Sequence, residues 1–171
     1  AIHYENMSIA LAESVANQGQ GFINSMAFGN GGTSVDPTGI ITYLTPNSTG
    51  TNASLYNQTF TKIVDDRSVS NLDPQRNKIE TRHVNGTNYT DVVVTCLLDY
   101  GEPNGQDATD TASASDSLYV FDELGLVSFA SSGTGKLLTH VVFHPVQKSL
   151  NRLIQIDYTV RVQSLTGFNE G

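Results

Sequence analysis

Apolar and polar residues alternate most regularly near the end of the chain, between Leu153 and Val162. One set of alternate positions is apolar or aromatic and the other is polar: Ile154, Ile156, Tyr158, Val160 and Val162 against Gln155, Asp157, Thr159 and Arg161. A period of two residues indicates a half-buried antiparallel strand. Two more strands are expected just before it, an aromatic-rich one through 117–126 and another from Lys136 to Phe143 that ends at Pro145. A Gly/Ser turn at 130–135 joins them, so this part of the chain predicts a β core.

Shorter strands are expected earlier in the chain. A strand within 21–32 ends at Gly29-Asn30-Gly31-Gly32, which we interpret as a turn that needs positive φ, because the G-x-G-x-x-G spacing of a phosphate loop is missing. Residues 33–58 are rich in turn-forming residues around a short strand at 40–44. A further strand at 59–64 precedes a polar connection at 65–77.

A hairpin is expected in the middle of the chain. Strands at Lys78–Val84 and Tyr89–Tyr100 flank Asn85-Gly86, which is a strong hairpin signal. The second of these strands is the most apolar in the chain, so we expect it to be central in its sheet. The sole cysteine, Cys96, lies in this strand and is expected to be buried and inert.

Helical spacing is convincing only in residues 1–18. Met7, Ala10, Leu11, Ser14 and Val15 form a narrow stripe of mostly small residues, which predicts docking on a sheet or on a neighbouring subunit. The predicted fold class is mainly β, an antiparallel β-sandwich with one N-terminal α-helix and long polar loops. The chain is expected to form a single domain, 1–171, with the helix at 1–18, the sandwich at 21–162 and a C-terminal tail at 163–171.

Composition changes this picture only by excluding partners. The chain of 171 residues has a formal net charge of −8, which argues against nucleic acid and an anionic membrane as partners. Charged residues make up only 15% of the chain, which is low for a soluble enzyme and suits a surface of hydroxyl and amide groups.

Residues that suggest chemistry are better explained by structural roles. Glu102, Asp107, Asp110 and Asp116 lack the spacing of a calcium loop, so 101–117 is interpreted as a solvated acidic loop. Residues 131–136 depart from a phosphate-binding P-loop, because Ala130 replaces its first glycine and Leu137 its hydroxyl residue.

Two further pairs of residues are possible sites. His140 and His144 are expected on the same face of one strand, but no third metal ligand is recognisable. Asp122 and Glu123 are adjacent on a strand, so we expect them to point to opposite faces. One of them should then be buried against an amide or against Arg152 or Arg161. The sequence predicts no enzyme and no cofactor.

Two short motifs stand in a characteristic order. The first is INSMAFGNG at 23–31 and the second is FDELGL at 121–126, followed by GKLL at 135–138 and the alternating strand at 154–162. In this order they resemble the N-terminal attachment region of bacteriophage tail-collar fibre proteins, in which I-x-x-M-A-x-G-x-G precedes E-I-G-L. Leu124 stands in place of the isoleucine. The segments 45–60 and 101–117 look like local insertions, and no repetitive shaft follows, which favours a virion component over a complete fibre.

The resemblance implies a function in assembly. It implies a structural component of a bacteriophage virion, made in the host cytoplasm, most specifically a tail, baseplate or fibre-attachment protein that docks other virion subunits as a homo-oligomer. A head decoration or neck protein is the alternative within this class. A carbohydrate-binding module is the alternative of another class, with Tyr43, Tyr56, Tyr89 or Tyr100 exposed for stacking on sugars. An enzyme would need a metal-binding pocket lined by His140, His144 and an acid.

The segments expected to contact other subunits are the helix and the long loops at 45–58 and 101–117. The candidate assembly contacts are Met7, Leu11, Val15, Asn47, Asn52, Tyr56, Asp107 and Asp110.

Overall fold

The computed structural model describes residues 1–103 and 118–165. Within them the chain forms one helix, α1 (Tyr4–Val15), and nine strands. The strands are β1 (Ile23–Gly29), β2 (Thr33–Val35), β3 (Ile41–Tyr43), β4 (Gln58–Ile63), β5 (Lys78–His83), β6 (Tyr89–Leu98), β7 (Leu118–Ser128), β8 (Val141–Ser149) and β9 (Ile154–Gln163).

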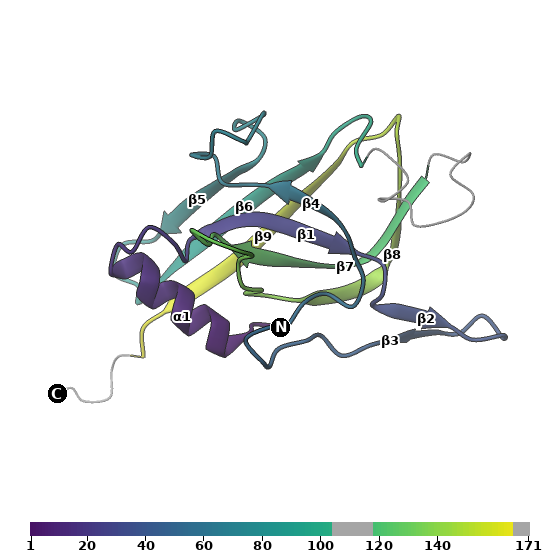
Figure 1. Ribbon diagram of the computed structural model, residues 1–171, viewed down its shortest axis with the longest axis horizontal. Coiled ribbons are helices and arrows are strands. Elements are labelled where there is room, and N and C mark those ends of the chain that lie inside the picture. The colour runs from purple at the N-terminus through teal and green to yellow at the C-terminus, as the bar shows by residue number, and fades with distance from the viewer. Residues whose placement is uncertain (104–117, 166–171) are drawn as a thin grey trace.

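The strands form two facing sheets and a projecting hairpin (Figure 1). One sheet has four antiparallel strands in the order β4-β1-β7-β8, and the other has three in the order β5-β6-β9. Strands β2 and β3 pair only with each other and extend away from the body. The predicted fold class, an antiparallel β-sandwich with one N-terminal helix, is therefore confirmed, and β6 is central in its sheet as expected.

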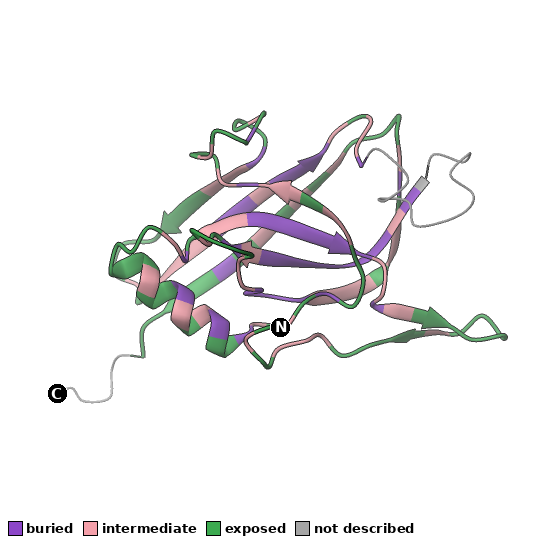
Figure 2. Ribbon diagram, viewed as in Figure 1, coloured by how far each residue is buried: buried purple, intermediate pink, exposed green. Residues whose placement is uncertain are grey.

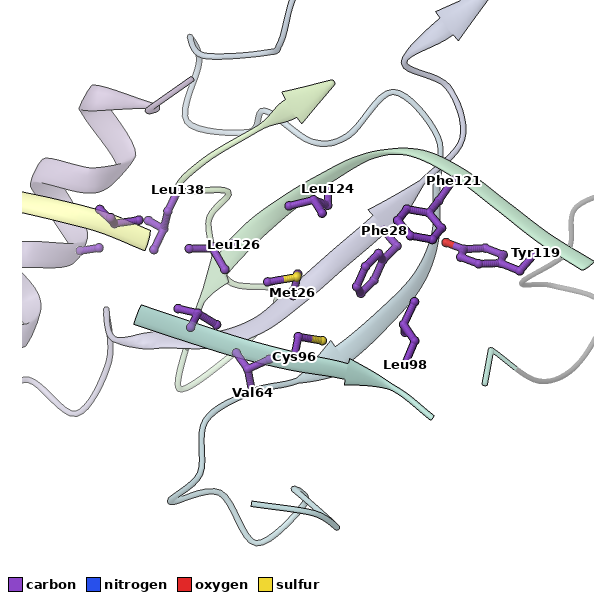
Figure 3. Packing of buried hydrophobic residues seen from close by; sticks show 13 residues of the cluster. Met26, Phe28, Val64, Cys96, Leu98, Tyr119, Phe121, Leu124, Leu126 and Leu138 are labelled. Atoms are coloured by element: carbon purple, nitrogen blue, oxygen red, sulfur yellow. The ribbon is translucent and has the colours of Figure 1, made fainter. Parts of the chain in front are cut away.

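The core lies between the two large sheets (Figure 3). Met26 and Phe28 of β1 face Cys96 and Leu98 of β6, and all four are fully buried. The ring of Phe121 from β7 meets the ring of Phe28 edge to face, with 5.3 Å between their centroids. Burial raises the pKa of the Cys96 thiol to about 12, which agrees with the expected inert cysteine.

The two motifs that carry the phage resemblance are neighbouring strands. Strand β1 pairs with β7 so that Met26 lies opposite Leu126 and Phe28 opposite Leu124. The glycine of each motif is sterically required: a Cβ atom at Gly125 would lie 2.3 Å from the carbonyl oxygen of Thr139, and one at Gly29 would lie 2.4 Å from that of Asn57. The large apolar residues of both motifs thus belong to the core that lies between the two sheets.

Strand β8 begins later than predicted and continues through the proline. The expected strand from Lys136 to Phe143 is wrong, because Leu137 and Thr139 form only isolated bridges, and β8 runs on past Pro145. Strand β8 is an edge strand, and an edge tolerates proline because one side of the strand has no ladder partner.

The helix is shorter than the predicted 1–18. The first residues are extended instead: Ile2 bridges to Thr139, and the amino group of Ala1 donates to the carbonyl oxygen of His140, 2.7 Å away. The buried side chain of His3 then caps the helix by accepting the N–H of Asn6 on Nδ1.

Candidate interaction surfaces

Asp122 and Glu123 of β7 both reach the segment that follows β1, contrary to the expectation of opposite faces. The register with β8 shifts between Phe121 and Glu123. Phe121 and Leu124 both pack in the core, so the two residues between them do not follow the regular alternation of a strand. Both carboxylates are buried, and neither is paired with an arginine. Asp122 accepts the N–H groups of Gly32 and Thr33 at 2.8 and 2.9 Å.

Asp122, Glu123 and His140 form a buried group that we call the carboxylate centre. Within it, Glu123 accepts the largest number of hydrogen bonds. Its carboxylate accepts the backbone N–H groups of Gly31, Tyr56 and Asn57 at 2.9–3.0 Å. It also lies 2.7 Å from Nε2 of the buried His140. Because Nδ1 of His140 accepts the N–H of Asn47, Nε2 carries the proton and donates to Glu123. A single carboxylate therefore ties β7 to the glycine segment, to the 45–57 loop and to His140.

The glycines at 29–32 are explained by this centre. The prediction that they need positive φ is wrong, because none of Gly29, Gly31 and Gly32 has it. A side chain at Gly31 would instead place its Cβ 2.8 Å from the Cβ of Tyr56. The glycines let the backbone approach the 45–57 loop and the two carboxylates closely.

Acidification is expected to remove the stability that ionised Glu123 contributes. Burial raises the pKa of this carboxyl group, but the hydrogen bond from His140 and those from the backbone outweigh burial and hold the pKa below its ordinary value of 4.5. The unfolded chain then binds more protons, so the free energy of unfolding falls as the pH drops from about 4.5 through the lowered pKa of the folded state.

Denaturant titrations between about pH 7 and about pH 2 measure this effect. In Glu123→Gln the free energy of unfolding should depend less steeply on pH in the acid range. The contributions of Asp36 and Asp91, whose pKa values are lowered by hydrogen bonds from Thr38 and Arg161, should remain. Identical slopes in the variant and the parent would contradict this assignment.

The β2–β3 hairpin, called the arm from here on, has one apolar and one polar face. Its register places Val35 opposite Ile41 and Thr33 opposite Tyr43, so Val35, Ile41 and Tyr43 share a face. Ser34 and Thr42 form the other face. Val35 is 62% exposed and Tyr43 is half exposed, and most of the arm lies in solvent (Figure 2). The arm is held at its base, where the N–H and hydroxyl groups of Thr33 donate to Asp122.

An apolar groove of about 540 Å³ lies between α1 and the three-stranded sheet. Its floor continues the core-facing side of that sheet, because Thr81, Val92 and Val160 lie directly opposite one another across β5, β6 and β9. Met7, Ala10 and Leu11 of α1 form one wall. Asp65, Asp66 and Arg67 also line the groove. At the groove the sheet therefore passes from buried Val160 to Val162, which is 42% exposed.

The loop between β4 and β5, residues 64–77, holds two apolar side chains in solvent. Val69 is 98% exposed and Leu72 is 95% exposed. The loop backbone is nevertheless fixed: the side-chain amide of buried Asn71 donates to the carbonyl oxygens of Asp65 and Asn77 at 3.1 and 2.8 Å. The loop therefore holds two apolar side chains in solvent on a fixed backbone.

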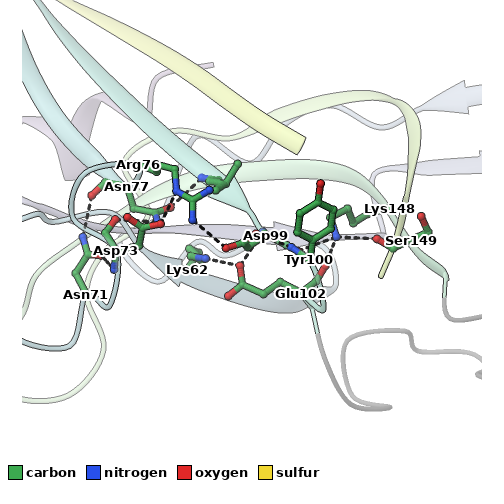
Figure 4. Close-up of polar contacts among 11 residues, drawn as sticks. Lys62, Asn71, Asp73, Arg76, Asn77, Asp99, Tyr100, Glu102, Lys148 and Ser149 are labelled. Carbon is green, nitrogen blue, oxygen red and sulfur yellow. Dashed lines mark hydrogen bonds and ion pairs between the residues drawn. The ribbon is translucent and has the colours of Figure 1, made fainter. Parts of the chain in front are cut away.

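A network of charges packs beside this loop (Figure 4). Arg76 pairs with Asp73 of the loop and with Asp99 at the end of β6. The buried ammonium group of Lys148 donates to the carbonyl oxygens of Asp99, Glu102 and Ser149 at 2.7–2.9 Å, and burial lowers its pKa. These contacts fix the loop against the ends of β6 and β8, so Val69 and Leu72 are presented on a rigid support.

The structure separates the predicted assembly contacts. Met7 and Leu11 line the groove together, whereas Val15 is 86% exposed beyond it. Asn47 is half-buried and Asn52 is exposed in a turn. Tyr56 is half exposed, donates its hydroxyl to the carbonyl of Thr45 and covers the ring of His140. Asp107 and Asp110 lie outside the described residues.

The other predicted groupings do not form. His140 is buried against Glu123, whereas His144 is exposed on β8, so the two do not share a site. Arg161 pairs with Asp91 and stacks on the ring of Tyr89, 3.8 Å from its centroid. The guanidinium group therefore covers one face of the Tyr89 ring, and that face is not open for stacking on a sugar. The exposed Tyr43, Tyr56 and Tyr100 lie on three separate elements.

The sequence predicts strand β3 of the arm as the short strand at 40–44, but it does not predict its partner β2 or the two exposed apolar residues of the 64–77 loop. The signal for the loop was present: Asp65, Ser68 and Asn71 each accept the N–H two residues ahead, which is the local turn that these residue types favour. Apolar residues inside such a run of turns cannot reach the core, and their exposure follows.

Comparison with protein-family models, with curated proteins and with solved structures gives no match for this chain. Among the described residues, no helix is long and apolar enough to cross a membrane. In the same part of the chain, no group of three or more His, Cys, Asp and Glu side chains is placed to hold a metal ion.

Proposed function

We propose that this protein is a non-enzymatic structural component of a bacteriophage virion, made in the host cytoplasm. Within the virion it serves as a tail, baseplate or fibre-attachment protein that docks other subunits as a homo-oligomer. The observation that carries the proposal is the presence of exposed apolar side chains on two tethered elements, the arm and the 64–77 loop. Such side chains gain free energy only when a partner covers them.

The phage resemblance supports the proposal through the fold. Its two motifs are the paired strands β1 and β7, and the glycines of both motifs are required by close backbone contacts. These residues are buried, so they support a resemblance in the scaffold of an attachment domain. The exposed surfaces described above would supply its contacts with other subunits.

The location of the chain tests the proposal. Virus particles are purified from the source of the chain on a density gradient, and their proteins are identified by mass spectrometry. The chain is expected in the particles together with other structural proteins, and immunogold labelling then distinguishes a tail or baseplate position from a head or neck position. A chain found only as a free protein with its own activity would refute the proposal.

Removing the apolar side chains of the 64–77 loop is expected to prevent incorporation without unfolding the protein. The double variant Val69→Ser/Leu72→Ser should lower the amount of chain in purified particles about tenfold or more, which corresponds to the loss of a central contact. Its melting temperature should match that of the parent, because both side chains are almost fully exposed. Val84→Ser, which also changes an exposed apolar loop residue, serves as the control and should be incorporated normally.

A further inference from the structure

The arm and the groove are complementary surfaces on one chain. The arm presents the apolar face of Val35, Ile41 and Tyr43, and the groove presents a stretch of sheet at which Val160 is buried and Val162 is 42% exposed. We infer that the arm of one copy docks, apolar face inward, in the groove of a second copy. This inference rests on the proposed assembly role and names the partner as the chain itself.

The groove is shaped to accept a strand face. Its floor is the core side of β5-β6-β9, and in the body of the molecule the same side is covered by the four-stranded sheet. An apolar β face is what such a surface packs against in a sandwich. Docking the arm there extends the covering layer over the residues that the molecule's own strands leave open, of which Val162 is 42% exposed.

One copy cannot make this contact with itself. The arm projects from one end of the molecule's longest axis, and α1, which walls the groove, lies toward the other end (Figure 1). Copies therefore associate either head to tail or as a two-fold pair in which each arm enters the other copy's groove. A head-to-tail contact closes into a ring when the rotation between copies allows it and otherwise continues as a filament, and both suit a symmetric position in a particle.

The arm also needs contacts beyond its own two strands for its stability. Two paired strands of three residues each do not suffice to hold a hairpin in water. Hydrogen bonds at its base fix its direction, because Thr33 is held by Asp122 and the N–H of Leu44 donates to the carbonyl oxygen of Gly32. Burial of the apolar face in the groove of a neighbouring copy supplies these additional contacts.

Charge favours the arm as the part that approaches a like-charged copy. The chain has a formal net charge of −8, so copies repel one another over most of their surface. Residues 33–44 carry a single charged side chain, Asp36, whose carboxylate is bonded within its own turn to Thr38 and Ile40.

The inference is tested by measuring the association state of the full chain and of two variants. Val35→Asp places a charge on the apolar face of the arm, and Leu11→Asp places one in the groove wall, where Leu11 is 41% exposed. The controls are Val84→Asp, a valine that is also 62% exposed, and Val15→Asp, on the same helix but outside the groove. Sedimentation velocity up to about 1 mM protein covers the range in which a small contact associates.

The parent and both controls are expected to form oligomers, and each test variant is expected to be a monomer with a parent-like melting curve. A mixture of the two test variants provides the sharpest readout. The groove of Val35→Asp and the arm of Leu11→Asp are intact, so one contact can form and the mixture should stop at a one-to-one dimer. Both substituted side chains, Val35 and Leu11, reach solvent, so neither substitution should unfold the protein.

Three results would overturn the inference. These are a parent that stays monomeric over the whole concentration range, a test variant that associates like the parent, and a mixture that forms no dimer. The proposed function is judged separately by the presence of the chain in virus particles. A monomeric parent that is nevertheless found in particles would refute the contact between copies and leave the virion role standing.

Discussion

Replacing Glu123 with alanine is expected to lower the free energy of unfolding by about 3–5 kcal/mol, the cost of breaking a buried charged network at one partner. The carboxylate is fully buried and accepts hydrogen bonds from Gly31, Tyr56, Asn57 and His140. Alanine leaves these donors without their acceptor. It also leaves a cavity between β7 and the 45–57 loop.

Urea unfolding at neutral pH measures this loss. Glu80→Ala is the matched control, because Glu80 is an exposed strand residue whose ion pair with Lys78 spans 3.6 Å, and its removal should cost less than about 1 kcal/mol. Glu123→Gln covers the case in which the alanine variant does not fold: it keeps one acceptor oxygen and should be less destabilised. Equal stability of the Glu123→Ala and Glu80→Ala proteins would contradict the role assigned to this carboxylate.

The same centre connects the core to the surfaces proposed for assembly. Asp122, next to Glu123 in β7, holds the base of the arm through Thr33, and Glu123 holds the loop that carries Tyr56. The direction of the arm is therefore set by a buried strand rather than by contacts along the arm itself. Loss of Glu123 should disturb this orientation as well as stability.

Alternation predicted the strands that have one buried and one exposed face. Strand β9 was expected at 153–162 and lies at Ile154–Gln163, because Ile154, Ile156, Tyr158 and Val160 pack on the core while the residues between them reach solvent. The hairpin around Asn85-Gly86 was expected for a related reason, since Gly86 supplies the positive φ that the turn needs.

The remaining features depend on contacts between segments far apart in the sequence. The register between β7 and β8 shifts between Phe121 and Glu123, so the expectation of opposite faces assumed a regular strand that does not exist there. The glycine segment was interpreted through its own φ, whereas the nearest neighbours of Gly31 are Tyr56 and Asn57. Strand β3 was predicted at 40–44, whereas its partner β2 was missed because its three residues are too short for a periodic signal.

Gly125→Ala is expected to cost about 3 kcal/mol of folding free energy, the upper range for overpacking a well-packed interior. The added Cβ would lie 2.3 Å from the carbonyl oxygen of Thr139 and 2.8 Å from Cδ1 of Leu137. Relief requires moving the 137–139 segment away from β7. That movement strains the 2.8 Å bond from the N–H of Leu138 to the carbonyl oxygen of Leu126. It also displaces the neighbouring His140 from Glu123.

Gly86→Ala provides the comparison for this variant. Gly86 has a φ of +89°, but a Cβ there meets no atom within 4 Å, so alanine pays only the backbone strain of about 1–2 kcal/mol. Urea unfolding should therefore rank the proteins as parent, Gly86→Ala and Gly125→Ala in decreasing stability. Hydrogen exchange should locate the Gly125→Ala damage in β7 and around His140. A Gly125→Ala protein as stable as Gly86→Ala would show that the 137–139 segment moves freely, and the steric explanation of the motif glycine would fail.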